Sequence, residues 1–96
     1  MSDKTCFAFE KITLSDKVER LNAEHFAPTG DVAKYAFITC EGAIRYRLDE
    51  VDPTNTDGHL LQDGDYLELE GELQLRRFKA INVDNILSIL QVSYER

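Results

Sequence analysis

The sequence predicts an all-β fold, a compact antiparallel β-sandwich or squashed barrel of about seven or eight short strands with at most one short helix. Three observations predict it. Apolar and polar side chains alternate with a period of two in most runs. Turn residues separate these runs at intervals near the roughly 8–12 residues typical of sandwiches and barrels. Most connections are too short for the crossover helix that parallel strands need.

Length and charge restrict the class of protein. The chain has 96 residues, so 1–96 is predicted to form a single β domain. It carries 18 acidic and 11 basic residues, a formal net charge of −7, and 43% hydrophobic residues. This hydrophobic fraction is close to the globular average and excludes a disordered acidic tail. The negative charge disfavours a nucleic-acid partner, because phosphate contacts need clustered lysine and arginine.

Hydropathy gives no sign of a membrane or an export signal. No apolar run approaches the roughly 20 residues of a membrane-spanning helix. The first residues lack the basic and apolar regions of a secretory signal. We therefore expect no membrane partner and a cytoplasmic location.

The first third of the chain predicts one strand and one ambiguous segment. Residues 5–14 are rich in β-branched and aromatic side chains and form the first expected strand. Residues 16–26 have two alternatives. Val18 and Leu21 lie at helical spacing, which predicts a short helix, but a turn followed by a strand over 21–26 fits equally well.

A hairpin is predicted next. Runs 33–40 and 43–48 both alternate, and only Glu41 and Gly42 separate them. Gly42 can adopt the positive φ that a tight turn demands. The second run places apolar side chains on one face and arginines on the other, namely Ile44, Tyr46 and Leu48 against Arg45 and Arg47.

A long irregular segment covers 49–64, a length that is usually functional or packed by its own side chains. Within it, 59–61 is predicted to enter the core, because two adjacent leucines need burial. The strand expected over 66–70 points Leu67 and Leu69 inward and its other residues outward.

Two further strands complete the fold. The first covers 73–83, after a two-residue connection at Gly71 and Glu72, with a β-bulge near Arg76 and Arg77. Its expected apolar contacts come from Leu73, Leu75, Phe78 and Ala80. The second covers 86–94 and has one apolar face whose only polar member is Ser88.

The two cysteines, Cys6 and Cys40, are predicted to be buried free thiols. Each lies in an apolar run, and a reducing cytoplasm keeps thiols unpaired. The chain has no C-x-x-C spacing, which disfavours a redox couple or a metal pair.

No catalytic residue and no cofactor are predicted. His25 and His59 are the side chains that titrate near neutral pH, but neither has a convincing set of partners, so each is interpreted as a structural polar residue. The chain contains no G-x-S-x-G nucleophile motif and no glycine-rich phosphate loop.

No metal site is predicted either. Residues 55–58 resemble the middle of a calcium loop, but that register puts Pro53 first and Gly64 last, where carboxylates are needed. The alternative is a cation site of another geometry, formed by Asp52, Asp57, Asp63 and Asp65.

Arg45 and Arg47 are candidates for ion pairs. One interpretation is a solvated outer sheet face shared with Glu68 and Glu70, because exposed ion pairs are common and weak. The functional interpretation is a contact with another subunit.

Four short motifs follow one another in the second half of the chain: Arg45-Tyr46-Arg47-Leu48-Asp49, Asp52-Pro53-Thr54, Gly58-His59-Leu60-Leu61 and Gly64-Asp65. In this order they resemble a family of small phage and prophage virion-associated β proteins. That family has an R-x-R strand, a D-G-x-x-P-T loop, a G-H followed by an apolar pair, and a G-D turn. The resemblance begins near Ala33 and continues to the strand ending at Tyr94. Glu50 stands where the family has glycine.

The resemblance implies a small β protein encoded among virion morphogenesis genes, without known catalysis. We therefore expect a non-enzymatic structural or interaction protein in the bacterial cytoplasm or the virion. It would self-assemble into a homo-oligomer or dock on a larger virion protein. The alternative is a small β-barrel module that binds a carbohydrate or similar polar ligand at the acidic loop 49–65. The candidate interface residues are Arg45, Arg47, Asp52, Pro53, Thr54, Asp57, Gly58 and His59.

Overall fold

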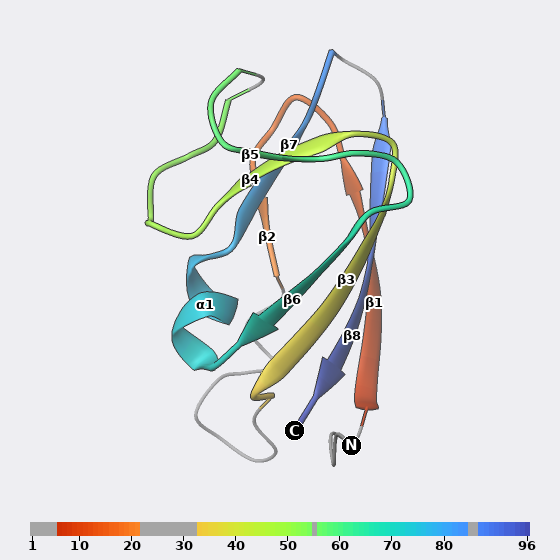
Figure 1. Cartoon of the computed structure of the whole chain (residues 1–96), viewed down its shortest axis with the longest axis vertical. Coiled ribbons are helices and arrows are strands. Elements are labelled where there is room, and N and C mark those ends of the chain that lie inside the picture. Colours follow the sequence, from red (N-terminus) through yellow and green to blue (C-terminus); the bar gives the residue numbers. More distant parts are fainter. Residues whose placement is uncertain (1–5, 22–32, 55, 85–86) are drawn as a thin grey trace.

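Two antiparallel four-stranded sheets face each other in the computed structural model, which describes residues 6–21, 33–54, 56–84 and 87–96 (Figure 1). The long sheet has the strand order β1 (Cys6–Leu14), β8 (Ser88–Glu95), β3 (Tyr35–Glu41) and β6 (Tyr66–Glu70). The short sheet has the order β2 (Glu19–Arg20), β7 (Lys79–Asn82), β4 (Ile44–Arg47) and β5 (His59–Leu61). One short helix, α1 (Glu72–Arg77), lies between β6 and β7. The predicted all-β sandwich is confirmed.

Four of the changes from one sheet to the other take place at one end of the sandwich. β1, β3, β5 and β7 all end there, and each is followed by a strand of the opposite sheet (Figure 1). Hydrogen bonds tie these connections together. Asn82 N donates to Ser15 O at 3.2 Å, and Ser88 Oγ donates to Ala43 O at 2.9 Å.

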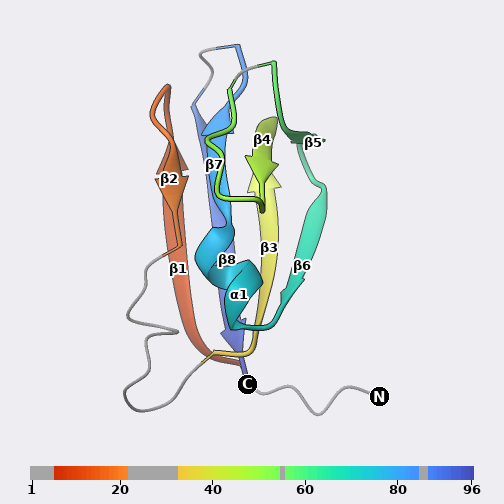
Figure 2. The ribbon, with the colours of Figure 1, turned by 90° about the vertical axis from the view of Figure 1, so that its left-hand side faces the viewer.

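The predicted hairpin of 33–40 with 43–48 is wrong, although both strands form. β3 pairs with β8 and β6 in the long sheet, whereas β4 pairs with β7 and β5 in the short sheet (Figure 2). Because both edges of β3 are already occupied, β4 has no edge of β3 to pair with. Gly42, with a φ of 83°, turns the chain from one sheet to the other.

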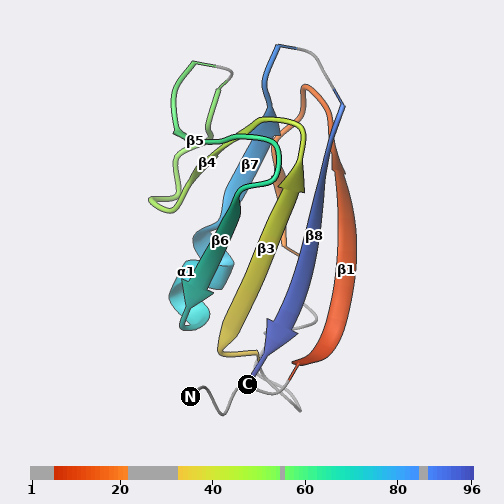
Figure 3. The same cartoon turned by 45° about the vertical axis from the view of Figure 1, so that its right-hand side comes forward.

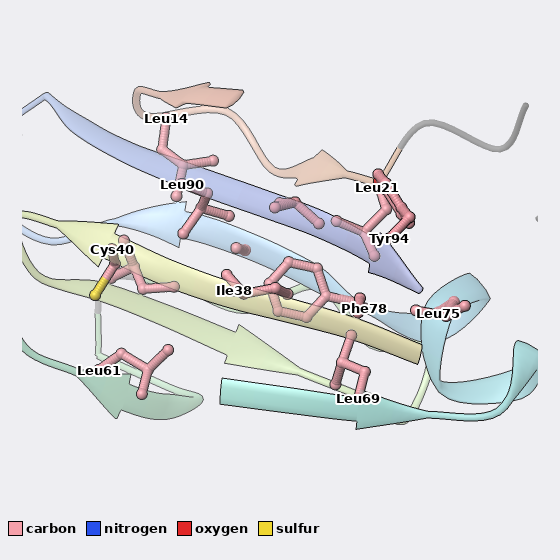
Figure 4. Close-up of a cluster of buried hydrophobic side chains, with 14 of the residues drawn as sticks. Leu14, Leu21, Ile38, Cys40, Leu61, Leu69, Leu75, Phe78, Leu90 and Tyr94 are labelled. Carbon is pink, nitrogen blue, oxygen red and sulfur yellow. The ribbon is translucent and has the colours of Figure 1, made fainter. Parts of the chain in front are cut away.

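The core lies between the sheets, and alternation of burial defines it (Figure 4). Every second residue of β3 and β8 is buried, as the period-two pattern predicts. On β8 the buried residues are Ser88, Leu90, Val92 and Tyr94, which confirms the predicted inner face of this strand over the described residues. The short sheet contributes Ile44, Leu61 and Ala80 from the other side.

The ambiguous segment 16–26 begins as a turn and a strand. Residues 16 and 17 form a bend, and Glu19–Arg20 form β2 and pair with β7, so the helix alternative is wrong over the described part. Leu21 is buried in the core. The remaining residues, 22–26 with His25, lie outside the described residues.

The strand predicted over 73–83 is wrong in its first half. Residues Glu72–Arg77 form α1, and β7 begins only at Lys79. Leu75 and Phe78 are buried, but Leu73 is 58% exposed. A spacing of three between buried residues is helical, whereas a strand would have placed Leu73 and Leu75 on one face.

β6 forms as predicted, whereas β5 is a strand inside the segment that was predicted to be irregular. Leu61 is buried and Leu60 is 44% exposed, so one leucine of the pair enters the core. Leu69 is buried and Leu67 half-buried, while the other residues of β6 are exposed.

Both cysteines are free, but only Cys40 is buried. The predicted burial of Cys6 is wrong, because its thiol lies at the exposed beginning of the edge strand β1. In the long sheet Cys6 is opposite Glu95 and Cys40 is opposite Leu90, five residues apart on β8. That is about 17 Å along the strand, beyond the reach of a disulfide.

We expect the two thiols to react at different rates. In the native protein, maleimide should label Cys6 quickly and Cys40 slowly, because burial raises the pKa of the Cys40 thiol and blocks access. After denaturation without reductant both should react, as counted by mass spectrometry. Equal native rates, or a mass deficit of two hydrogens, would contradict this expectation.

Candidate functional site

The eight predicted interface residues lie on β4, on β5 and on the loop between these strands. Arg45 and Arg47 belong to β4, and His59 begins β5. The two strands are antiparallel neighbours, with Tyr46 opposite His59, so the loop returns to the place where it began (Figure 3). The structure therefore brings all eight residues to one corner of the short sheet. Whether they form an interface stays a prediction.

Gly58 allows the loop to lie directly against β4. Arg45 Nη1 donates to Gly58 O at 2.9 Å. Gly58 has a φ of 134°, and a Cβ there would lie 3.1 Å from Tyr46 O and 3.3 Å from Pro53 Cβ. A larger residue would push the loop away, so glycine is required at this close approach.

Pro53, Thr54 and Asp57 shape the loop, the first as a buried residue and the other two on its exposed side. Pro53 is fully buried. Thr54 N donates to Asp57 O at 2.9 Å, and Asp57 N donates to Thr54 Oγ1 at 2.9 Å, which closes a turn. These three residues therefore have structural roles.

Arg47 forms an ion pair with Asp49 within the same chain. Its guanidinium group donates two hydrogen bonds to the carboxylate, Nε to Oδ1 at 2.9 Å and Nη2 to Oδ2. These bonds lower the pKa of Asp49 and raise the pKa of Arg47. Arg45 and Arg47 are on the short sheet, whereas Glu68 and Glu70 are on the long sheet, so the predicted shared face of these four residues is wrong.

We expect the titration of Asp49 to report this ion pair. In Arg47→Gln, the Asp49 carboxylate loses its main hydrogen-bond donor, so the midpoint of its titration should move to higher pH. The NMR chemical shift of the Asp49 side-chain carbonyl carbon follows this titration. The pKa of Asp49 is lower in the folded protein than in the unfolded chain. The ion pair therefore stabilises the fold fully above the unfolded pKa, about 3.9, and this stabilisation is lost as pH falls through the folded pKa. Arg76→Gln, which removes an ion pair with Glu72 instead, should leave Asp49 unchanged. An unshifted midpoint in Arg47→Gln would refute the pair.

A second group of contacts holds the loop against β7. Lys79 Nζ donates to Asp52 Oδ1 at 2.9 Å and to Glu50 O at 3.2 Å. Arg77 Nε lies 3.7 Å from Glu50 Oε1. Glu50 has a φ of 67°, in the left-handed region, which costs a residue other than glycine about 1–2 kcal/mol. The residue that stands in place of glycine in the resembled pattern is therefore strained.

The strand pairing also places three basic residues in one row across the short sheet, which the sequence did not predict. Arg20 is opposite Lys79, and Lys79 is opposite Arg47, so three basic side chains cross the outer face of the short sheet. The carboxylates of the loop neutralise two of them within the chain. No local signal could have found this row, because Arg20 lies in an ambiguous segment and Lys79 in a strand whose register was unknown.

A pocket of about 440 Å³ opens beside the loop, lined by Arg47, Leu48, Asp49, Gly58 and His59. His59 is exposed, and its ring packs on Tyr46 with the centroids 5.3 Å apart. Tyr46 in turn stacks on buried Phe78 at 5.8 Å, and burial raises the pKa of Tyr46. The pocket offers a guanidinium, a carboxylate and an imidazole to a small polar ligand.

The acidic residues of 49–65 do not gather into a metal site among the described residues. Asp52 binds Lys79, Asp63 Oδ1 accepts from Gly42 N at 2.9 Å, and Asp65 Oδ2 accepts from Gln62 N at 2.9 Å. Three of the four candidate carboxylates, those of Asp52, Asp63 and Asp65, therefore already have partners within the protein.

We therefore expect calcium to leave the thermal stability unchanged. A ligand that binds only the folded state raises its stability by about 2.7 kcal/mol at 100 times its Kd, which a thermal melt detects readily. A clear increase in Tm with millimolar calcium, absent with magnesium, would show that the loop rearranges around a cation.

The outer face of the long sheet carries aromatic side chains. Phe9 and Phe37 lie on either side of Ser93 in one cross-strand row. Tyr66 contacts Phe37, with ring centroids 5.6 Å apart, and is 63% exposed; Phe9 is 56% exposed. Tyr35 is two residues from Phe37 and so shares its face. We call Phe9, Tyr35, Phe37 and Tyr66 the aromatic face.

No protein-family model, curated protein or solved structure matches the chain. Among the described residues, no helix is long and apolar enough to cross a membrane.

Proposed function

We propose that the chain is a non-enzymatic interaction protein that docks on a larger protein through its aromatic face. The observation that carries this proposal is the exposure of Phe9 and Tyr66 on a sheet face that also presents Phe37. Aromatic residues are enriched at protein interfaces and supply much of their binding energy. Such side chains on the outer face of a small acidic protein favour a binding role.

The resemblance of the sequence to small phage proteins indicates which kind of partner to expect. On that basis the larger protein is a virion protein, and the chain is a small structural component, present in the bacterial cytoplasm before assembly or in the particle after it. An interaction protein of this kind needs a stable fold and a binding surface, and needs no acid–base or nucleophilic group.

Co-purification with the products of the flanking genes tests the docking proposal. Tyr66→Ser should reduce the affinity, because truncating an interface aromatic at the centre of a contact costs about 2 kcal/mol, or roughly thirtyfold in Kd. Leu73→Ser is the matched control, since Leu73 is 58% exposed but lies on α1 outside the aromatic face. The proposal fails if no flanking product binds, or if Tyr66→Ser binds as well as the control.

Self-association into a homo-oligomer is the second form of the proposal. It would use the β4–β5 corner with Arg45 and Arg47, where an acidic neighbour would compete with Asp49 for Arg47. Light scattering should then show an assembly that Arg47→Glu weakens and Arg76→Glu does not. A monomeric wild type at high micromolar concentration leaves only docking on a different protein.

The pocket beside the acidic loop favours a ligand-binding module as the alternative function. Its mixed lining of Arg47, Asp49 and His59 suits a carbohydrate or a similar polar ligand. Titration with a panel of oligosaccharides should change the NMR shifts of residues 47–49 and 58–59 if this function is correct. Absence of such changes across the panel would eliminate it.

A further inference from the structure

The outer face of the short sheet carries charge of one sign only. β4, β5 and β7 contain no acidic residue. Glu19 of β2 is opposite the buried Ala80, so it lies on the inner side of the sheet. We call the outward-pointing cations the basic face; they are Arg20, Arg45, Arg47 and Lys79. In a chain of net charge −7, this segregated positive charge forms a surface that attracts acidic groups.

Residues 49–52, which we call the acidic arm, occupy part of the basic face. The arm follows β4 and crosses in front of β7 in Figure 2. Each of its three carboxylates meets a cation of the short sheet or of the adjoining end of α1. The pairs are Asp49 with Arg47, Glu50 with Arg77, and Asp52 with Lys79. The arm therefore shows which ligand chemistry this face accepts, namely a short acidic segment.

Charge holds the acidic arm in place. All four of its side chains are exposed, whereas the next residue, Pro53, is fully buried. No main-chain hydrogen bond joins residues 49–52 to another of the described residues; instead Lys79 Nζ donates to Glu50 O at 3.2 Å. Segments with few buried contacts open at a low free energy. The arm can therefore leave the face while the loop stays anchored at Pro53.

The acidic arm matches the basic face poorly. Arg77 Nε is buried without a hydrogen-bond partner, because Glu50 Oε1 is 3.7 Å away. Glu50 also has the strained left-handed backbone. Arg20 is exposed at the end of the cation row and pairs with no carboxylate of the described residues. An unstrained acidic segment that also reaches Arg20 would therefore bind this face better than the arm does.

The distance across the row and the net charge select the kind of partner. Arg20 and Arg47 are two strand spacings apart, about 10 Å, which an extended segment spans in about three residues. Two copies of this chain that exchanged arms would form the same pairs as before and would lose translational freedom. A nucleic acid is disfavoured because the net charge of −7 repels a dense row of phosphates. A short acidic segment of a different protein fits best.

We propose that the basic face binds a short acidic segment of a partner protein, and that the acidic arm competes with this segment for the same cations in the unbound chain. The arm is then an autoinhibitory contact, which the segment displaces. This inference goes beyond docking through the aromatic face. The two surfaces belong to different sheets, so either proposal can fail without the other.

Fluorescein-labelled hexaglutamate is the probe, and fluorescence anisotropy at low salt measures its Kd. The released variant, Asp49→Asn/Asp52→Asn, removes two carboxylates of the arm. It should bind about tenfold more tightly than the wild type, because the apparent affinity of an occluded site rises with the fraction that is open. The control is Glu41→Gln/Glu72→Gln, which changes the net charge equally at exposed positions outside the basic face. It should bind like the wild type.

Arg20 tests whether the partner segment extends past the acidic arm. In the released variant, Arg20→Gln should weaken binding about threefold, because it removes a cation that the arm leaves unpaired. Lys11→Gln is the matched control, since Lys11 is exposed on β1 of the long sheet. It should not change the Kd. Added salt should weaken the binding of hexaglutamate in every variant.

NMR on the wild type locates the bound probe. Saturating hexaglutamate should shift the amide resonances of Arg20, Arg47 and Lys79 and leave that of Tyr66 on the aromatic face unchanged. This measurement does not depend on whether a variant folds.

Four outcomes would overturn the inference. The released variant binds no more tightly than the charge-matched control, Arg20→Gln has no effect, or the NMR shifts appear on the long sheet. In the fourth, a thymidine oligonucleotide of equal charge binds the released variant more tightly than hexaglutamate, which would indicate a nucleic-acid partner instead.

Discussion

Replacing Leu75 with alanine is expected to lower the free energy of unfolding by about 3 kcal/mol, because truncating a buried leucine loses apolar contacts and leaves a cavity. Leu75 is fully buried on the inner side of α1. In a domain of this size such a loss lowers Tm by roughly 4–8 °C per kcal/mol. Alanine is the best helix former, so the loss measures packing and not the helix itself.

Leu73→Ala is the matched control for this expectation. It is the same substitution in the same helix, but Leu73 is 58% exposed, so the change should stay within about 0.5 kcal/mol. If 73–83 were a strand, the two leucines would share a face and their truncations would cost similar amounts. Urea unfolding of both variants therefore decides between helix and strand, and equal losses would reject α1.

Replacing Gly42 with alanine should be much more costly than replacing Gly64. Both glycines have positive φ, 83° and 86°, so both substitutions incur the left-handed backbone cost of about 1–2 kcal/mol. At Gly42 a Cβ would also lie 2.8 Å from Ser88 Oγ and 3.4 Å from Leu87 O, whereas at Gly64 it would meet nothing within 4 Å. We expect a total loss of about 3 kcal/mol at Gly42 and about 1 kcal/mol at Gly64.

The difference between the two variants isolates one contact. Effects on the unfolded chain are alike for two Gly→Ala changes, so they cancel in the comparison. The remaining term is the collision with Ser88, whose hydroxyl ties the beginning of β8 to Ala43 O. Thermal or urea unfolding measures it. Equal losses would mean that the corner between β3 and β4 has room for a methyl group.

The candidate site was predictable in part. Two adjacent leucines after a polar loop indicated that 59–61 enters the core, and Leu61 does so. That 59–61 forms a strand beside β4, which gathers the residues of the site, became evident only from the structure. The partners of its charges were not predictable. Asp49 is two residues from Arg47 and binds it, but Lys79 is 27 residues from Asp52, and only the pairing of β4 with β7 brings the two together.

Local alternation in the sequence by itself determined the strands β3, β4, β6 and β8 and the side that each one buries. Period two is a property of the extended backbone, and a strand with one apolar face must bury it whatever its neighbours are.

Only the tertiary structure decided which sheet each strand joins and where helix α1 lies. A strand has two edges, and partners from distant parts of the chain compete for them. β6 and β8 occupy both edges of β3, so β4 crosses to the other sheet despite a two-residue connection. No local pattern in the sequence records the outcome of this competition.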